Sequence, residues 1–201
     1  MSFRCLFAAL AASACLAAAP AASAAVIAFD GFAGGSSWSE DGYTIATANG
    51  FFLVSNFGDS QPSMFPFRTN TVVEVTRDGG GAFDFVSVML RELNGNVGAQ
   101  TLTFTGTLAG GGTVSQTVTT DGVCCSGLSA NDFEVFSFGS AFTNLLSVSW
   151  DQLAPEAVVA YDNFVLEATA VPAPAALGAF ALGIAGLGVA GRRRNVQATA
   201  G

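Results

Sequence analysis

The sequence predicts an all-β protein: a single β-sandwich, of the jelly-roll type, between an N-terminal signal peptide and a C-terminal transmembrane helix. Two observations carry this prediction. Between residues 26 and 167, short runs of Val, Thr, Phe and Leu alternate with turns of Gly, Asn, Asp and Ser, and no segment of helical period reaches ten residues. Outside that region the chain consists of Ala-, Leu- and Gly-rich stretches without acids. The 201 residues therefore divide into an export segment, one domain and a tail.

The export segment, residues 1–24, has the pattern of a secretory signal peptide. Arg4 precedes an apolar stretch, and the Ala-Ser-Ala sequence at 22–24 places small side chains where a signal peptidase needs them. We expect cleavage after Ala24 and export of the remainder. An uncleaved anchor and a lipoprotein modified at Cys15 are the alternatives that the pattern leaves open.

The predicted domain spans residues 25–170 and contains ten segments with the composition of strands. Alternating segments of this kind bury one face and expose the other. In the segment 145–152, the period-two pattern places Leu146, Val148 and Trp150 on one face. The ten predicted strands are 26–30, 43–47, 51–55, 71–76, 83–92, 101–109, 113–120, 133–138, 145–152 and 158–168.

Composition and charge exclude several classes of function. The chain has no His and only 7 basic residues against 15 acids. All 15 acids but only three of the arginines lie inside the predicted domain, which gives the domain a net charge of −12. Such a domain is not expected to bind nucleic acid or anionic lipid. Without His or Lys it has no Ser-His or Cys-His pair, no His-ligated zinc and no Schiff base. We expect no catalysis, and the acids are interpreted as solvated groups rather than as a glycosidase pair.

Two motifs at opposite ends of the domain set an acid between aromatic residues: FDGF at 29–32 and YDNF at 161–164. Jelly-roll sugar-binding modules, which the predicted sandwich resembles, often pair their first and last strands and hold a structural calcium ion there. That resemblance implies Asp30, Asp162 and Asn163 as calcium ligands, because calcium takes hard oxygen donors. The alternative is that both Asp residues cap turns.

Three aromatic residues are candidates for contact with a sugar ligand. Trp38 lies in a polar, Gly-rich stretch, and Phe65 and Phe67 lie in a long predicted loop, 56–70. The favoured alternative is that these rings fold back to cover an edge of the sheet.

Loss of the signal peptide leaves two adjacent cysteines, Cys124 and Cys125. Export places them in an oxidising compartment. Their Cα atoms, about 3.8 Å apart, are closer than in ordinary disulfides. A vicinal disulfide in a loop is the preferred interpretation, and two free thiols or an intermolecular bridge remain open.

The tail contains the segment VPAPAALGAFALGIAGLGVAGRRR at 171–194. Residues 175–191 have no polar side chain, and as a helix they extend about 25 Å, enough to cross the hydrocarbon of a bilayer. The basic cluster 192–194 follows where a cytoplasmic flank is expected, and 195–201 form a short cytoplasmic tail.

The tail resembles the PEP-CTERM sorting signal, in which a Pro-Glu-Pro motif, a short apolar helix and a basic cluster end the chain. The resemblance covers about an eighth of the sequence, and Ala173 stands where the family has Glu. The family implies processing by exosortase, a membrane transpeptidase of bacteria that make exopolysaccharide. The matching positions are Val171, Pro172, Ala173, Pro174, Arg192, Arg193 and Arg194.

The resemblance implies a cell-surface or extracellular-matrix protein that is structural or adhesive and associated with exopolysaccharide. The chain would be exported through the inner membrane, anchored there transiently and then sorted by an exosortase-like transpeptidase. The alternative is a carbohydrate-binding or carbohydrate-active β-sandwich that stays anchored in the membrane. A plain membrane-anchored domain is the third interpretation.

Overall fold

The computed structural model describes residues 24–56, 62–67, 71–93, 98–123, 132–152 and 159–169. All of them lie within one unit, Ala22–Thr169. The predicted signal peptide up to residue 23, the sorting segment 171–194 and the tail 195–201 lie outside the described residues. No residue in the described part of the chain belongs to a helix long and apolar enough to cross a membrane.

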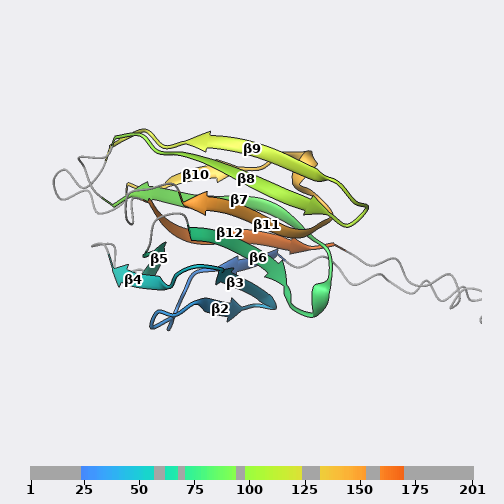
Figure 1. Cartoon of the computed structure of the whole chain (residues 1–201), viewed down its shortest axis with the longest axis horizontal. Helices are drawn as coiled ribbons and strands as arrows, with labels where there is room; N and C mark the ends of the chain where they lie inside the picture. The colour runs from blue at the N-terminus through green and yellow to red at the C-terminus, as the bar shows by residue number, and fades with distance from the viewer. Residues whose placement is uncertain are drawn as a thin grey trace, which may run out of the picture. The chain divides into compact units, whose positions relative to one another are not determined.

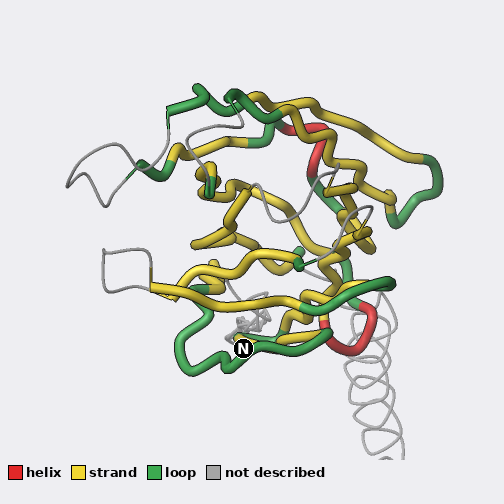
Figure 2. The backbone as a smooth tube through the Cα atoms, turned by 60° about the vertical axis from the view of Figure 1, so that its left-hand side comes forward, coloured by secondary structure: helices red, strands yellow, loops and turns green. Residues whose placement is uncertain are grey.

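The described residues form strands and loops with two short 3-10 turns, drawn in red in Figure 2. Their bounds are β1 Ala24–Ile27, β2 Ser37–Glu40, β3 Tyr43–Thr47, β4 Phe52–Asn56, β5 Pro62–Pro66, β6 Thr71–Arg77, η1 Asp78–Gly80, β7 Phe83–Glu92, β8 Thr101–Leu108, β9 Thr113–Thr119, β10 Glu134–Ser137, η2 Ser140–Phe142, β11 Leu145–Gln152 and β12 Val159–Ala168. The all-β prediction is therefore confirmed, and each predicted strand has a counterpart.

Two of the strands were not predicted. β2 has the sequence SWSE, which contains no β-branched residue, and β5 has the sequence PSMFP, with a proline at each end. Both compositions indicate loops. Pairing with β3 and β4 respectively makes them strands, so the register of a neighbour outweighs the local propensity.

The strands form two antiparallel layers. One layer has the order β2-β3-β6-β11-β8-β9, and the other has the order β10-β7-β12-β5-β4, with β1 paired beside β12. Figure 1 shows both layers face-on, with β9 and β10 at the top and β2 and β4 at the bottom. A single pair between Leu145 of β11 and Phe83 of β7 joins them into one nearly closed sheet.

An aromatic core fills the space between the layers. Trp150 of the first layer lies 4.9 Å from Phe104 beside it and 5.3 Å from Tyr161 of the second layer, measured between ring centroids. Phe85 reaches Phe104 across the core at 6.0 Å. All of these side chains are at most 2% exposed. Burial of a large apolar side chain contributes roughly 1.5–3 kcal/mol each, so this cluster is a main source of stability.

β-Bulges change which residues face the core. Between Leu145 and Ser147 the register of β11 shifts, so Leu145 is fully buried and Leu146 is 43% exposed. The prediction that Leu146 shares a face with Val148 and Trp150 was therefore wrong. The period-two argument fails because the bulge inserts an extra residue and reverses the alternation.

Gly106 of β8 leaves the space that Leu145 occupies. A Cβ atom at Gly106 would lie 2.9 Å from Cδ2 of Leu145 and 3.1 Å from Cγ2 of Val114. Any larger residue at this inward-facing position would overpack the core. The glycine in the otherwise regular TLTFTGTL pattern is therefore a packing requirement.

Candidate functional site

The outer face of the β2-β3-β6-β11-β8-β9 layer is covered with hydroxyl groups. We call this surface the hydroxyl face. Its hydroxylated side chains are Ser37, Ser39, Thr44, Thr76, Thr101, Thr103, Thr105, Thr107, Thr113, Ser115, Thr117, Thr119, Ser147 and Ser149. The remaining outward positions are Ala46, Val72, Glu74, Asp151 and, at the bulge in β11, the exposed Leu146.

The hydroxyl face has a regular lattice, because residues in register lie opposite one another on the same side of a sheet. Two continuous rows cross all six strands. Strand spacing makes each row about 24 Å wide. The rows are Ser37-Ala46-Glu74-Ser149-Thr105-Ser115 and Ser39-Thr44-Thr76-Ser147-Thr107-Thr113.

Hydrogen bonds between hydroxyls fix the side chains at the β8–β9 end of the hydroxyl face. The oxygens are 3.0 Å apart in Thr101–Thr119, 2.9 Å in Thr103–Thr117 and 3.2 Å in Thr105–Ser115. These pairs use one hydrogen bond of each hydroxyl, and a hydroxyl can make up to three. The array therefore keeps donors and acceptors for a ligand in an ordered arrangement.

The hydroxyl face is neutral over most of its area. Its only charged groups at the outward positions are Glu74 and Asp151, and no arginine occurs among those positions. A surface without cations, on a chain of net charge −8, repels polyanions and suits an uncharged, hydroxyl-rich ligand.

The predicted aromatic Trp38 is held in the structure by its neighbours. It lies on β2 with its side chain half-buried against the core, and its ring centroid is 5.0 Å from that of Phe32. Its Nε1 donates to Oε2 of Glu40 at 3.1 Å. That oxygen also accepts the backbone N–H groups of Ala28 at 3.2 Å and Phe29 at 3.1 Å. The sequence did not indicate this role of Glu40.

Phe65 and Phe67 lie on and just after β5, not in an extended loop. Phe65 is half-buried, whereas Phe67 is 44% exposed, with its ring 5.2 Å from that of Phe51. Phe67 is the one exposed aromatic ring among the described residues. The described surface therefore offers no row of rings for stacking, and binding would depend on hydrogen bonds.

The residues predicted to bind calcium lie near the junction of β1 and β12. Asp30 is exposed in the turn that follows β1, whereas Asp162 is 3% exposed on β12. Asp162 Oδ1 accepts the N–H of Asn163 at 2.7 Å, and Asn163 Nδ2 lies 3.3 Å from Sδ of Met89. Asn163 has a φ of 45° at a bulge in β12. A calcium ion at these residues stays a prediction.

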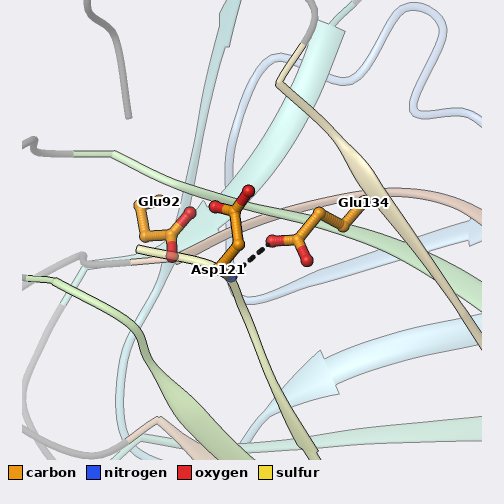
Figure 3. A group of neighbouring side chains, drawn as sticks. All are labelled: Glu92, Asp121 and Glu134. Atoms are coloured by element: carbon orange, nitrogen blue, oxygen red, sulfur yellow. Dashed lines mark hydrogen bonds between the residues drawn. The ribbon is translucent and has the colours of Figure 1, made fainter. Parts of the chain in front are cut away.

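A second group of acids was not predicted. Carboxylate oxygens of Glu92, Asp121 and Glu134, from β7, the segment after β9, and β10, lie within 4.8 Å of one another (Figure 3). Glu134 Oε1 accepts the N–H of Asp121 at 2.9 Å, drawn as the dashed line. The sequence could not reveal this cluster, because its members are separated by 29 and 13 residues and meet only where β7 and β9 end and β10 begins.

Glu92 is 1% exposed, and its carboxylate accepts hydrogen bonds from the protein. Its Oε1 accepts from the hydroxyl of Thr120 and, at 2.8 Å, from the N–H of Gly122. Gly122 has a φ of 80°, and a Cβ there would lie 2.6 Å from the backbone N of Ala99. Only glycine fits this approach. The Glu92 carboxylate thus has a structural role as the acceptor that fixes the segment after β9.

Burial raises the pKa of Glu134, and the carboxylates of Asp121, Glu92 and Asp132 raise it further. The hydrogen bond from the Asp121 N–H acts in the opposite direction, because it favours the ionised form. The cluster therefore concentrates negative charge around the partly buried carboxylate of Glu134.

A cleft of about 430 Å³ opens beside the start of β1 and the end of β12. Its lining residues are Ala24, Ala25, Asp41, Gly42, Tyr43, Arg77, Asp78 and Ala168. Tyr43 is 3% exposed, and burial raises the pKa of its hydroxyl.

Cys124 and Cys125, like the positions Val171–Pro174 and Arg192–Arg194, lie outside the described residues.

No known family profile matches the chain, and no curated protein matches it. Solved structures do. A point variant of a family 29 carbohydrate-binding module is 9% identical, with a TM-score of 0.43 over 74% of this chain and 94% of that one. A Clostridium thermocellum family 11 module in complex with a β-1,3-1,4-mixed-linked tetrasaccharide is 12% identical, with a TM-score of 0.39 over 75% and 98%.

A third similar structure is the CBM22-1–GH10 part of the Clostridium thermocellum xylanase 10B, complexed with xylohexaose. It is 12% identical, with a TM-score of 0.43 over 72% of this chain and 28% of that one. All three TM-scores are below 0.5, so none of these structures indicates what this chain binds.

Proposed function

We propose that this chain is an exported, non-catalytic surface protein whose β-sandwich binds neutral polysaccharide through the hydroxyl face. The observation that carries the proposal is the six-stranded, cation-free array of Ser and Thr hydroxyls. A polysaccharide presents the same groups at regular spacing, and each hydroxyl is both donor and acceptor. The role is structural or adhesive, in association with exopolysaccharide.

Each hydroxyl contact is weak, because the sugar and the protein both give up hydrogen bonds to water. A net gain of about 0.5–1.5 kcal/mol per bond requires many contacts for useful affinity. A polysaccharide can contact many hydroxyls of the face at once. After its first contact has formed, each further contact is intramolecular and adds to the overall affinity. This favours long glycans over short oligosaccharides.

The export and sorting parts of the proposal come from the two ends of the sequence. A signal peptide removed after Ala24, an apolar helix at 175–191 and the basic cluster 192–194 support transient anchoring in the inner membrane. The Val-Pro-Ala-Pro motif at 171–174 supports release by an exosortase-like transpeptidase. Strands that alternate between the two layers from β6 to β8 and from β9 to β12 support the jelly-roll assignment of the domain.

Binding is tested by affinity electrophoresis of the purified protein in gels containing a neutral β-glucan, a neutral mannan or anionic alginate. We expect retardation by a neutral polymer and none by alginate. Thr103→Ala and Thr105→Ala together should reduce the retardation at least about fivefold. Thr143→Ala is the matched control, because Thr143 is an exposed hydroxyl residue that bonds the Ser140 carbonyl away from the hydroxyl face. Retardation that survives the double substitution would overturn the assignment of this face.

Sorting is tested by mass spectrometry of the surface protein from the producing cell. The expected C-terminus lies near Pro174, without Arg192–Arg194. A surface protein that retains the three arginines would contradict processing, and it would leave glycan binding by the domain unaffected.

A further inference from the structure

β9 is an open edge of the first layer. Among the residues that the structure describes, β9 pairs with β8 alone. Its seven residues, TVSQTVT, contain no charge, no proline and no glycine, and its register with β8 runs without a shift from Thr113 to Thr119. Proteins usually protect such an edge with charges, prolines, bulges or very short strands. None of these devices is present on β9.

The hydrogen bonds at the ends of the hairpin show which backbone groups face outward. Leu108 N donates to Gly112 O at 3.1 Å, and Thr120 N donates to Gln100 O at 2.9 Å. These pairs are the hydrogen-bonded ones, so by the alternation of an antiparallel ladder residues 114, 116 and 118 also bond to β8. The N–H and C=O groups of Thr113, Ser115, Thr117 and Thr119 therefore point away from β8, toward the open side.

We propose that the β9 edge pairs with the β9 edge of a second copy of this chain, in antiparallel register about a two-fold axis at Gln116. That axis sets Thr113 opposite Thr119 of the other copy and Ser115 opposite Thr117, so all four outward-pointing residues meet outward-pointing partners. A two-fold interface of this kind is self-complementary and closed. The β2-β3-β6-β11-β8-β9 layers of the two copies join into one continuous sheet, and the hydroxyl face doubles in width.

Charge favours a second copy at this edge over other surfaces. The chain carries a net charge of −8, so two copies repel each other at most surfaces, but β9 contributes no charge. In the proposed register Asp121 of each copy lies opposite Gly111 of the other, which keeps the nearest acids apart. Association should therefore strengthen as added salt screens the net repulsion.

Two of the other edge strands, β2 and β10, are less suited to pairing. β2 and β10 have four residues each, and each contains an acid, Glu40 and Glu134. β10 lies on the same side of the sandwich as β9, since Gln116 Nε2 donates to Ser137 O at 3.0 Å. Val135 of β10 is 63% exposed there and adds apolar surface near the proposed contact.

The test compares the full chain with two variants of Thr117. Thr117→Pro removes an outward N–H and the hydroxyl that bonds Thr103, but it leaves the backbone hydrogen bonds to β8 in place, because proline is tolerated on the open side of an edge strand. Thr117→Val keeps the N–H and is the matched control. Sedimentation velocity from micromolar to millimolar protein, at low and high salt, measures the association, and amide hydrogen exchange locates it.

We expect dimers of the wild-type chain and of Thr117→Val, with Ser115 and residue 117 amides protected only at high concentration. Thr117→Pro should weaken the dimer at least about tenfold, while protection at Val114 and Val118 shows that the β8–β9 ladder is intact. The proposal is overturned if Thr117→Pro associates as strongly as wild type. It is also overturned if the outward amides exchange rapidly in the dimer, or become protected only when another protein is added.

Discussion

The hydroxyl oxygens of Thr103 and Thr117 lie 2.9 Å apart across the β8–β9 hairpin, on the exposed side of the sheet. Their backbones form a non-hydrogen-bonded pair, in which side chains lie closest. The arrangement repeats at Thr101–Thr119 and Thr105–Ser115, so the hairpin fixes a ladder of hydroxyls rather than a set of freely rotating side chains.

Replacing both threonines of that pair by valine should show a small coupling. Exposed cross-strand pairs contribute about 0.2–1 kcal/mol, and valine keeps the β-branched shape. Urea denaturation of Thr103→Val, Thr117→Val and the double variant measures the coupling free energy. Strict additivity of the two single effects would contradict an interaction between the hydroxyls.

Glu40 is expected to stabilise the turn after β1. Glu40→Ala leaves the Trp38 Nε1–H and the N–H groups of Ala28 and Phe29 without their acceptor. The loss should be about 2–3 kcal/mol in the free energy of unfolding. Glu40→Gln retains an acceptor oxygen and should lose about half as much.

Urea denaturation measures both Glu40 variants, and a change in tryptophan emission reports on Trp38, because the other tryptophan, Trp150, is buried in the core. A red shift is expected for Glu40→Ala, because the indole loses its partner and gains contact with water. Equal losses in the alanine and glutamine variants would show that the carboxylate oxygen is not the stabilising acceptor.

Gly106 and Leu145 are expected to be energetically coupled. Gly106→Ala places a Cβ 2.9 Å from the Leu145 side chain and should cost about 1–3 kcal/mol. Leu145→Ala alone should cost about 2–5 kcal/mol, because Leu145 is fully buried. The double variant should lose clearly less than the sum, since the new methyl group occupies part of the cavity. An additive loss in chemical denaturation would contradict the contact.

Glu134 should make stability decrease as the pH rises. Its folded-state pKa is raised, so its protonated form contributes stability that is fully present below the unfolded value of about 4.3 and is lost as the pH rises through the folded pKa. Glu134→Gln cannot ionise and still accepts the Asp121 N–H. It should match wild type near pH 4 and be slightly more stable than wild type at pH 7, because Glu134 is only partly buried and water screens the effect.

The check is the difference in free energy of unfolding between wild type and Glu134→Gln at pH 4 and pH 7. Asp132→Asn removes only the weakest of the carboxylates that raise the pKa of Glu134. Its free energy of unfolding should therefore differ less from that of wild type between pH 4 and pH 7 than that of Glu134→Gln does. If wild type instead became more stable than Glu134→Gln as the pH rises to 7, the raised pKa of Glu134 would be contradicted.

Calcium bound through Asp30, Asp162 and Asn163 should raise the thermal midpoint. An ion at about 100 times its dissociation constant adds about 2.7 kcal/mol, and a chelator removes the gain. Asp162→Asn should abolish the calcium response, whereas Glu134→Gln should retain it. Differential scanning calorimetry with and without chelator distinguishes the outcomes. If only Glu134→Gln lost the calcium-dependent rise of the thermal midpoint, the ion would be assigned to the Glu92–Asp121–Glu134 cluster instead.

The alternation of the sequence was sufficient to predict the strands that pack a regular face. β3, β7 and β11 have the predicted bounds, and Trp150 is buried as its period indicates. The exceptions are places where a strand depends on its neighbour or departs from regular pairing. β2 and β5 exist because β3 and β4 pair with them, and the bulge in β11 exchanges the places of Leu145 and Leu146.

By itself the sequence determined the all-β class, the acidic and His-free chemistry of the domain, and the two apolar ends that predict export and sorting. These follow from composition and from local periodicity, which need no partner. Only the tertiary structure decided that threonines of β8 and β9 share one face with serines of β2 and β11, and that Glu92, Asp121 and Glu134 converge. The reason is physical: which residues meet depends on strand order and register, and these are set by long-range pairing across the whole sandwich.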